Sequence, residues 1–444
     1  MENFKENVGK EVNSWRINPE EIIITPVREP ISLDSIPFPY EGMEAFQNKI
    51  VYYESSRGCP FSCSYCLSSI DKWVRLRRTE LVKKELKILM DYQVPQVKFV
   101  DRTFNCNKKH AMEIWEFIKE QDNGITNFHF EISADLMDED EIEFLATLRP
   151  GQVQFEIGVQ STNPDTVDAI HRRMDFLKLS RNVELIKRGN NIHQHLDLIA
   201  GLPLEGYDDF EKSFHDVYNL KPDQLQLGFL KILKGSLMEM ECKTYGIAYR
   251  NTAPYEVLFT NSLSYEELLK IKGACEMVEI YYNSGQFTYA ICYLEHFYNS
   301  PLKLFQEINE YYENKNIALQ AHSRIKRYEI LLDFYKEKVA NTIKEEEAVS
   351  IALFQEILVL DLFLREDMKS RPSFAPVHAR QYNLRELYEK HRGSRSAIHI
   401  EQFTFDVLIS SKSGQPVRKD TVLLFDYNDR DPLNKAAKRT LIRE

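Results

Sequence analysis

The chain has 444 residues, of which 43% are hydrophobic and 28% are charged, and its formal net charge is −11. This composition is typical of globular proteins and excludes disordered and fibrous chains, and the length predicts one large domain with one or two smaller ones. The negative charge argues against broad contact with a nucleic-acid backbone, so we expect no nucleic-acid partner. No segment approaches about 18 uninterrupted apolar residues, so we expect no membrane span.

The first residues, MENFKENVGKEVNSW, contain no apolar core of the kind found in secretory signals. Seven cysteines in a chain of this length, without such a signal, do not form the disulfide framework of a small secreted protein. These features predict a cytoplasmic protein. In that reducing compartment a tight cluster of cysteines indicates metal binding or redox chemistry.

Residues 1–50 contain five prolines and little periodicity, which predicts an extended N-terminal lead-in. Residues 51–240 alternate between short β-rich runs and amphipathic helical patterns. The β-rich runs cover residues 51–56, 96–101, 127–133, 152–158, 192–200 and 223–233. Six β–α units with right-handed crossovers form a parallel sheet covered by helices. Because a closed barrel of this type has eight units, we predict an α/β fold with a partial (β/α)6 TIM-like barrel.

One face of several predicted strands is polar, given the two-residue period of a β-strand. The polar sets are His129, Glu131 and Ser133; Gln152, Gln154 and Glu156; and His193, His195 and Asp197. Polar side chains that pointed outward would be buried against helices at a cost, so we expect them to line a ligand cavity inside the barrel. The last set could also form a facial triad for iron, although polar lining is the simpler interpretation.

The sequence pattern changes after about residue 240, and residues 241–444 are predicted to form a mostly helical accessory or substrate domain that ends in strands. Aromatic-rich helical segments cover residues 280–298, 329–343 and 348–364, and strand character returns at 398–409 and 421–428. We therefore predict an α-helical region followed by a small C-terminal β-containing segment. The aromatic content fits both a packed helical core and a lid or substrate pocket.

Three cysteines are clustered where the first predicted strand ends, in the segment ESSRGCPFSCSYCLSS at residues 54–69. Cys59, Cys63 and Cys66 have the spacing C-x3-C-x2-C. Three thiolates on one short loop can ligate three irons of a [4Fe–4S] cluster and leave the fourth iron open. A structural zinc site normally has four protein ligands in two separated pairs, and no second C-x2-C pair is present. The motif therefore predicts an iron–sulfur cluster.

The spacing of these cysteines, with the aromatic Tyr65 before the third, resembles that of the radical S-adenosylmethionine (radical SAM) superfamily. The resemblance extends over about residues 50–235. Within it, FEIGVQSTNPDTVDAIHR (155–172) and DLIAGLP (197–203) look like segments of the branch that contains oxygen-independent coproporphyrinogen oxidase and the cobalamin-dependent enzymes. It implies an enzyme that binds S-adenosylmethionine (SAM) at the open iron. It also implies reductive cleavage of SAM to a 5′-deoxyadenosyl radical, which abstracts hydrogen from a substrate.

The same resemblance implies contacts with SAM for Tyr65, Asp101, Glu131, Gln160, Arg172 and Asp197. Tyr65 would lie beside the adenine, and Asp197 would bind the ribose hydroxyls. Glu131 and Gln160 would contact the methionyl or ribose region, and Arg172 would approach the carboxylate. Many relatives have a glycine pair that touches the methionyl amine, where this chain has Asp101-Arg102-Thr103, so Asp101 could bind the amine by charge. Glu131, Arg172 and Asp197 could instead have structural roles.

The segment INPEEIIITPVREPISLDSIPFPY before the cysteines resembles the linker that follows a cobalamin-binding domain in the same branch. A doubly wound cobalamin domain needs on the order of 100 residues, about twice the number that precede the cysteines. No D-x-H-x-x-G motif is present either. We therefore expect no cobalamin on this chain alone, and a separate cobalamin-binding protein is an open alternative. The C-terminal half resembles a poorly characterised domain attached to such enzymes.

The sequence thus predicts a radical SAM enzyme that acts on an unidentified substrate and needs a reductant such as flavodoxin or ferredoxin. Two alternatives remain open. The chain could be a non-catalytic protein that binds or carries a cluster, haem or SAM. It could also be a tRNA-modifying methylthiotransferase, although it lacks a second three-cysteine cluster and is acidic.

Overall fold

The structure, a computed structural model, describes residue 26 and residues 29–40, 42–46, 48–342, 347–368, 370–376, 383–392 and 397–443. Much of the lead-in predicted at residues 1–50 lies outside the described residues. Its described segment, residues 29–40, packs beside the start of the barrel, where Arg77 Nη2 donates to the carbonyl oxygen of Ile36 at 3.0 Å.

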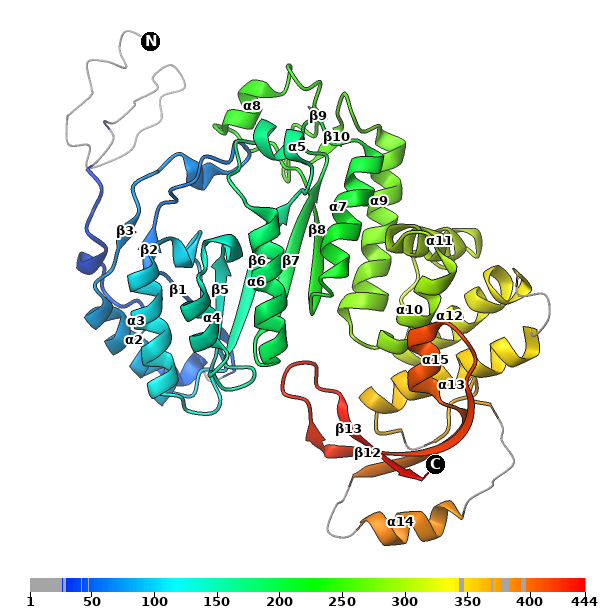
Figure 1. The fold of residues 1–444 in the computed structure, drawn as a ribbon. Helices are drawn as coiled ribbons and strands as arrows, with labels where there is room; N and C mark the ends of the chain where they lie inside the picture. The colour runs from blue at the N-terminus through cyan, green and yellow to red at the C-terminus, as the bar shows by residue number, and fades with distance from the viewer. Residues whose placement is uncertain are drawn as a thin grey trace.

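A six-stranded parallel sheet forms the first half of the molecule, in the strand order β1-β4-β5-β6-β7-β8 (Figure 1). The strands are β1 Ile50–Tyr53, β4 Gln96–Phe99, β5 Asn127–Ile132, β6 Val153–Gln160, β7 His193–Ala200 and β8 Gln224–Phe229. The helices between them are α2 Thr79–Asp91, α3 Lys108–Glu120, α4 Glu139–Leu145, α5 Pro164–Ala169, α6 Phe176–Gly189 and α7 Tyr207–Asn219. β1 and β8 remain unpaired with each other, which confirms the predicted partial (β/α)6 barrel.

The face of the sheet that packs against the helices is aromatic. Phe99, Phe130 and Phe155 occupy neighbouring strands, and the rings of Phe99 and Phe130 are 4.5 Å apart at their centroids. Trp115 on α3 covers this row, with its ring 6.0 Å from that of Phe155. All four side chains are fully buried, and such rings contribute much of the apolar area of a core. Because side chains alternate along a strand, the residues between these phenylalanines point into the barrel.

The cysteine-containing loop, residues 58–74, is closed at its base by two short strands. β2 (Ser56–Arg57) and β3 (Arg75–Leu76) pair in an antiparallel ladder on either side of it. Gly58 opens the loop with a φ of +97°, and a Cβ there would lie 2.4 Å from the carbonyl oxygen of Trp73. Both the dihedral angle and the close approach require glycine, so the turn into the cysteines is set by this residue.

The C-terminal half is mostly helical and ends in a small antiparallel sheet, as predicted (Figure 1). Its helices are α9 Tyr265–Val278, α10 Thr288–Leu294, α11 Pro301–Asn314, α12 Arg324–Lys338, α13 Glu347–Arg365, α14 Leu384–Arg392 and α15 Val407–Ser413. The sheet has the order β11-β12-β13, with β11 Ile398–Phe405, β12 Arg418–Arg430 and β13 Ala437–Arg443. The strand predicted over residues 398–409 was too long. It ends at Phe405 because the side chain of Asp406 caps α15 by accepting from the N–H of Ile409.

Short elements connect the two halves, namely α8 Leu237–Glu241, β9 Ala248–Tyr249 and β10 Val257–Phe259. The domain boundary predicted at residue 240 falls within α8 and stays a prediction. The edge strand β8 is covered by the C-terminal half. Asn283 accepts from the N–H of Leu225 at 2.9 Å and donates to its carbonyl oxygen at 2.8 Å. This pairing satisfies backbone groups that an edge strand would otherwise leave open.

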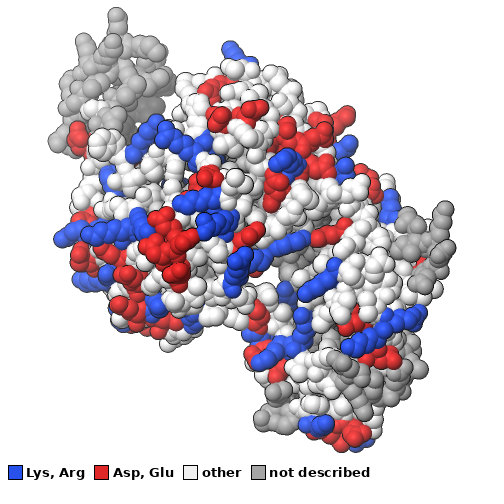
Figure 2. Space-filling view, viewed as in Figure 1, with Lys and Arg blue, Asp and Glu red and all other residues white. Residues whose placement is uncertain are grey.

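The charged surface carries both signs. On the face shown in Figure 2, basic and acidic side chains are interspersed rather than gathered into one broad basic area. Within the part of the chain that the structure describes, no helix combines the length and the apolar character needed to cross a membrane.

Candidate functional site

A cavity lies at the carboxyl ends of the barrel strands, next to the cysteine-containing loop. Its empty volume is about 840 Å³, including the part that is open to solvent. The lining residues are Cys59, Phe61, Cys63, Tyr65, Cys66, Arg102, Thr103, Glu131, Ile132, Ser133, Glu156, Gly158, Gln160, Arg172, Arg173 and Asp197. Ligand sites in parallel α/β folds occupy this edge of the sheet. Glu131, Glu156 and Asp197 come from the predicted polar faces, so the prediction of a polar inner lining is confirmed for these residues.

The three cysteines are held at this cavity by backbone hydrogen bonds of their loop. The N–H of Cys59 donates to the carbonyl oxygen of Asp71 at 3.0 Å. Ser64, between the second and third cysteines, donates its N–H to the carbonyl oxygen of Ile170 at 2.9 Å and accepts from the N–H of Met238 at 2.9 Å. The loop is therefore tied to the end of α5 and to α8, and all three thiols line one cavity.

Two carboxylates lie side by side on the inner face of the barrel. Glu131 on β5 is the register partner of Glu156 on β6. Glu156 accepts from Lys98 Nζ at 3.1 Å, and its carboxylate lies 2.9 Å from His129 Nε2. The hydrogen bond with His129 lowers the pKa of Glu156 to about 2, whereas burial and the charge of Glu156 raise the pKa of Glu131 to about 7. One carboxyl is thus a fixed anion, and its neighbour can hold a proton near neutral pH.

Arg172 and Gln160 meet at the end of β6. Arg172 Nη2 donates to the carbonyl oxygen of Gly158 at 2.5 Å, and Nη1 lies 3.8 Å from Cys63 Sγ. The pairing of β6 with β7 is irregular here, and Gln160 has a φ of +74°. A Cβ on Gly158 would lie 2.3 Å from Gln160 Nε2, so the amide occupies the space that glycine leaves. The bulge and the glycine together bring Gln160 and Arg172 to the same wall.

Three buried polar atoms of this wall have no hydrogen-bond partner among the described residues, namely Gln160 Oε1, Arg172 Nε and Asp197 Oδ1. Asp197 Oδ1 lies 3.0 Å from His195 Nε2, which is close enough for an ion pair, but the atoms are not aligned for a hydrogen bond. Buried polar atoms are normally satisfied, so these three are suited to a polar ligand. The acceptor of Gln160 matches the amine of SAM, the guanidinium donor of Arg172 matches its carboxylate, and the carboxylate of Asp197 matches its hydroxyl groups. The residues present therefore fit this cofactor.

Most of the predicted site residues are brought together at this cavity: Cys59, Cys63, Tyr65, Cys66, Glu131, Gln160, Arg172 and Asp197. Asp101 is instead fully buried behind the cavity wall. Its carboxylate accepts from the N–H of Ser55 at 3.0 Å and from the hydroxyl of Ser55 at 2.7 Å. Burial raises the pKa of Asp101 to about 6. This position does not match a contact with the SAM amine, and it anchors the chain just before the cysteine-containing loop.

Ser133 and Glu156 belong to the predicted polar lining of the barrel. The other lining residues were not predicted, namely Phe61, Arg102, Thr103, Ile132, Gly158 and Arg173. Arg102 follows Asp101 and Arg173 follows Arg172, so the prediction identified the right turns but missed one cavity-lining side chain in each. The conformation of a turn decides which of its side chains point into the cavity. The spacing of residues in the sequence does not show this. Gln152 also departs from the prediction, because it precedes β6 and donates to the carbonyl oxygen of Ile118 at 2.7 Å instead of lining the barrel.

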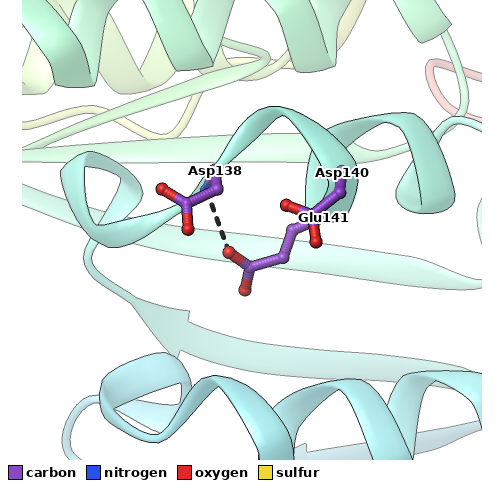
Figure 3. A group of neighbouring side chains, drawn as sticks. All are labelled: Asp138, Asp140 and Glu141. Carbon is purple, nitrogen blue, oxygen red and sulfur yellow. Dashed lines mark hydrogen bonds between the residues drawn. The ribbon is translucent and has the colours of Figure 1, made fainter.

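A second group of acidic side chains, Asp138, Asp140 and Glu141, lies at the start of α4 (Figure 3). The N–H of Asp138 donates to Glu141 Oε2 at 2.9 Å, as the dashed line in Figure 3 shows. Lys108 Nζ lies 3.1 Å from Asp138 and 2.9 Å from Asp140. Helix capping and this shared lysine account for the cluster, and we assign it no ligand.

The comparison with known proteins connects this cavity to a family. Residues 53–217 match the family model of the radical SAM superfamily. Residues 243–425 match a family described as a protein of unknown function, DUF4080.

Individual relatives match over the first part of the chain. An uncharacterized methyltransferase of Pyrococcus horikoshii is 28% identical over 177 residues, which cover 39% of this chain and 37% of the relative. The cobalamin-dependent radical SAM methyltransferase TokK of Streptomyces tokunonensis is 26% identical over 162 residues, which cover 34% of this chain and 23% of the relative. The matched part thus spans less than half of the length of these two proteins.

Among solved structures, the cobalamin-dependent S-adenosylmethionine radical enzyme OxsB aligns with a TM-score of 0.47 and 13% sequence identity, over 76% of this chain and 57% of that one. The cysteine motif, the barrel and the matched family model agree with one another. Residues 53–217 thus form a radical SAM domain, which is followed by a DUF4080 domain at residues 243–425.

Proposed function

We propose that this protein is a radical SAM enzyme, in which SAM binds in the cavity beside a [4Fe–4S] cluster held by Cys59, Cys63 and Cys66. The observation that carries the proposal is that three thiols and three buried polar atoms without a hydrogen-bond partner among the described residues line the same cavity. Three protein thiolates leave one iron of a [4Fe–4S] cluster for an exogenous ligand. The adjoining polar wall is suited to an amino acid and a ribose.

The side chains of the wall have distinct roles in this proposal. Arg172, fixed by the carbonyl of Gly158, pairs with the carboxylate of SAM, and Asp197 accepts from the ribose hydroxyls. Gln160 and Glu131 bind the methionyl or ribose region, and Tyr65 lies beside the adenine. When bound, the reduced cluster supplies the single electron that splits SAM into methionine and a 5′-deoxyadenosyl radical, which takes a hydrogen atom from the substrate. The protein orients SAM and shields it from water.

Three further points belong to the same proposal. The electron comes from a soluble reductant of the flavodoxin or ferredoxin type, and the protein works in the cytoplasm, where thiols stay reduced. The barrel domain spans residues 51–240, and residues 241–444 form the accessory or substrate domain.

The test is anaerobic reconstitution with iron and sulfide, followed by reduction with dithionite in the presence of SAM. We expect 5′-deoxyadenosine and methionine in equal amounts, detected by chromatography. The matched control is the variant in which Cys59, Cys63 and Cys66 are all replaced by alanine, which should yield neither product. A protein with an intact cluster that binds SAM and never cleaves it would be a carrier, and the proposal would be wrong.

A further inference from the structure

Two arginines of the cavity wall have no role in the proposed binding of SAM. Arg102 follows β4, and Arg173 lies in the turn between α5 and α6. Both arginines are exposed. The described residues place no carboxylate within ion-pairing distance of either guanidinium, and no hydrogen bond of either side chain to the protein is present in that part of the chain. Both donors are therefore available at the cavity.

Six other arginines of the barrel each have a carboxylate partner among the described residues. The pairs are Arg57 with Glu54, Arg75 with Asp71, Arg77 with Glu85, Arg78 with Asp34, Arg149 with Asp122, and Arg181 with Glu139. These pairs include exposed and buried arginines. Arg188 on α6 is also exposed and has no ion pair among the described residues, but it does not line the cavity. Arg102 and Arg173 differ from it because they line the cavity.

The carboxylates of the cavity do not compensate the two arginines. Glu156 pairs with Lys98 and His129, and Asp197 lies beside His195. Glu131 is near enough to Arg102 for the arginine to oppose the rise of its pKa, but the two do not form an ion pair. SAM has a single carboxylate, which Arg172 binds in the proposed function. The wall thus has two guanidinium groups more than SAM needs.

We propose that Arg102 and Arg173 bind an oxyanion of the substrate, either a carboxylate or a phosphate. The inference rests on the proposed function, because a substrate of a radical SAM enzyme must reach the cavity that holds SAM. A guanidinium offers parallel N–H donors that match two oxygens of a carboxylate or phosphate. The two side chains come from the turn after β4 and from the α5–α6 turn, and an anionic group bound by both would fix the substrate relative to the cysteine-containing loop.

The experiment is equilibrium dialysis of the reconstituted protein against radiolabelled inorganic phosphate and, separately, radiolabelled malonate, with and without SAM. We expect saturable binding of at least one anion in the presence of SAM. Arg102→Gln and Arg173→Gln should each weaken it by about tenfold or more, the effect of losing a hydrogen bond to a charged group. The matched control is Arg181→Gln, since Arg181 is an exposed arginine of α6 outside the cavity. The anion that binds more tightly identifies the class of the substrate group.

Equal anion binding by the wild type and by both cavity variants would overturn the inference. Loss of SAM binding in either variant would also overturn it, because that arginine would then belong to the cofactor site. Production of 5′-deoxyadenosine is measured separately on the same samples. A protein that binds phosphate or malonate through the two arginines but does not cleave SAM contradicts the proposed function and leaves the anion site standing.

Discussion

Glu131 and Glu156 lie directly opposite each other on the neighbouring strands β5 and β6, on the inner face of the barrel. Like charges at such positions repel, and only Glu156 has cationic partners, Lys98 and His129. The repulsion therefore disfavours the charged form of Glu131, and burial together with the charge of Glu156 raises the pKa of Glu131 to about 7. The pair stores unfavourable energy at the cavity in the absence of a ligand.

This arrangement predicts a specific pH dependence of stability. The pKa of Glu131 is about 7 in the folded protein and lower in the unfolded chain, so the folded state binds more protons between these values. Stability therefore falls as the pH rises through this window. Glu131→Gln should stabilise the cluster-free protein by about 1–3 kcal/mol at about pH 8 and have little effect at about pH 4.

Thermal unfolding at the two pH values measures the effect of Glu131→Gln. The control is Glu143→Gln, an exposed position on α4, which should change the unfolding temperature little at either pH. Destabilisation by Glu131→Gln at the higher pH would contradict the prediction. The same substitution should weaken SAM binding, because stabilising a strained site commonly costs function.

A buried ion pair connects the residue that follows β3, Arg77, to α2, and Arg77 also bonds the described part of the lead-in. Arg77 Nε donates to Glu85 Oε2 at 3.0 Å, and Tyr53 donates its hydroxyl to the same oxygen at 2.6 Å. The two charged side chains are only 8% and 9% exposed. Arg77→Met should destabilise the protein by about 3–5 kcal/mol, because it leaves the Glu85 carboxylate buried without its cation.

Urea unfolding compares Arg77→Met with Arg78→Met, in which the neighbouring arginine loses its pair with Asp34. Arg78 is 67% exposed, so its loss should cost about 1 kcal/mol or less. The double variant Arg77→Met/Glu85→Met should recover much of the lost stability, since no unpaired charge remains. Similar costs for the two single variants would show that the pair is not effectively buried.

The cysteines of the loop should differ sharply from those elsewhere in the barrel. Replacement of any one of Cys59, Cys63 and Cys66 by alanine should remove most of the cluster absorbance and bound iron after reconstitution. Cys106 supplies the matched control, since it is a half-buried cysteine that does not line the cavity. Cys106→Ala should retain the iron content of the wild type. Equal loss of iron in all four variants would contradict the assigned ligand set.

The contact between Asn283 and the edge strand β8 should hold the two halves of the molecule together. Asn283→Ala leaves the N–H and the carbonyl oxygen of Leu225 without their side-chain partner. We expect a loss of about 1–3 kcal/mol in the free energy of unfolding. Limited proteolysis should cut between the halves more readily. Asn341→Ala is the control, because Asn341 is exposed and donates to the carbonyl oxygen of Glu337, four residues earlier in the same half of the molecule. An equal loss there would refute a special role for Asn283.

The sequence by itself determined the six strands, their polar inner faces and the cysteine motif. The two-residue period of polar and apolar residues shows which face of a strand is buried. The three cysteines lie close together on one loop, so the motif can be recognised without knowing any contact between distant parts of the chain. It also identified the turns that carry the cofactor-site candidates, as with Gln160 and Arg172. Its boundaries failed where a local cap intervened, as at Asp406, which starts a helix inside a predicted strand.

Only the tertiary structure decided which side chains reach the cavity. Asp101 accepts a hydrogen bond from Ser55 behind the cavity wall, and its neighbour Arg102 lines the cavity. The conformation and packing of the turn after β4 determine this arrangement. The absence of an ion pair for Arg102 and Arg173, in the residues described, depends on the placement of every element around them. Strand register likewise set Glu131 against Glu156, because pairing between strands is a long-range property that no single segment encodes.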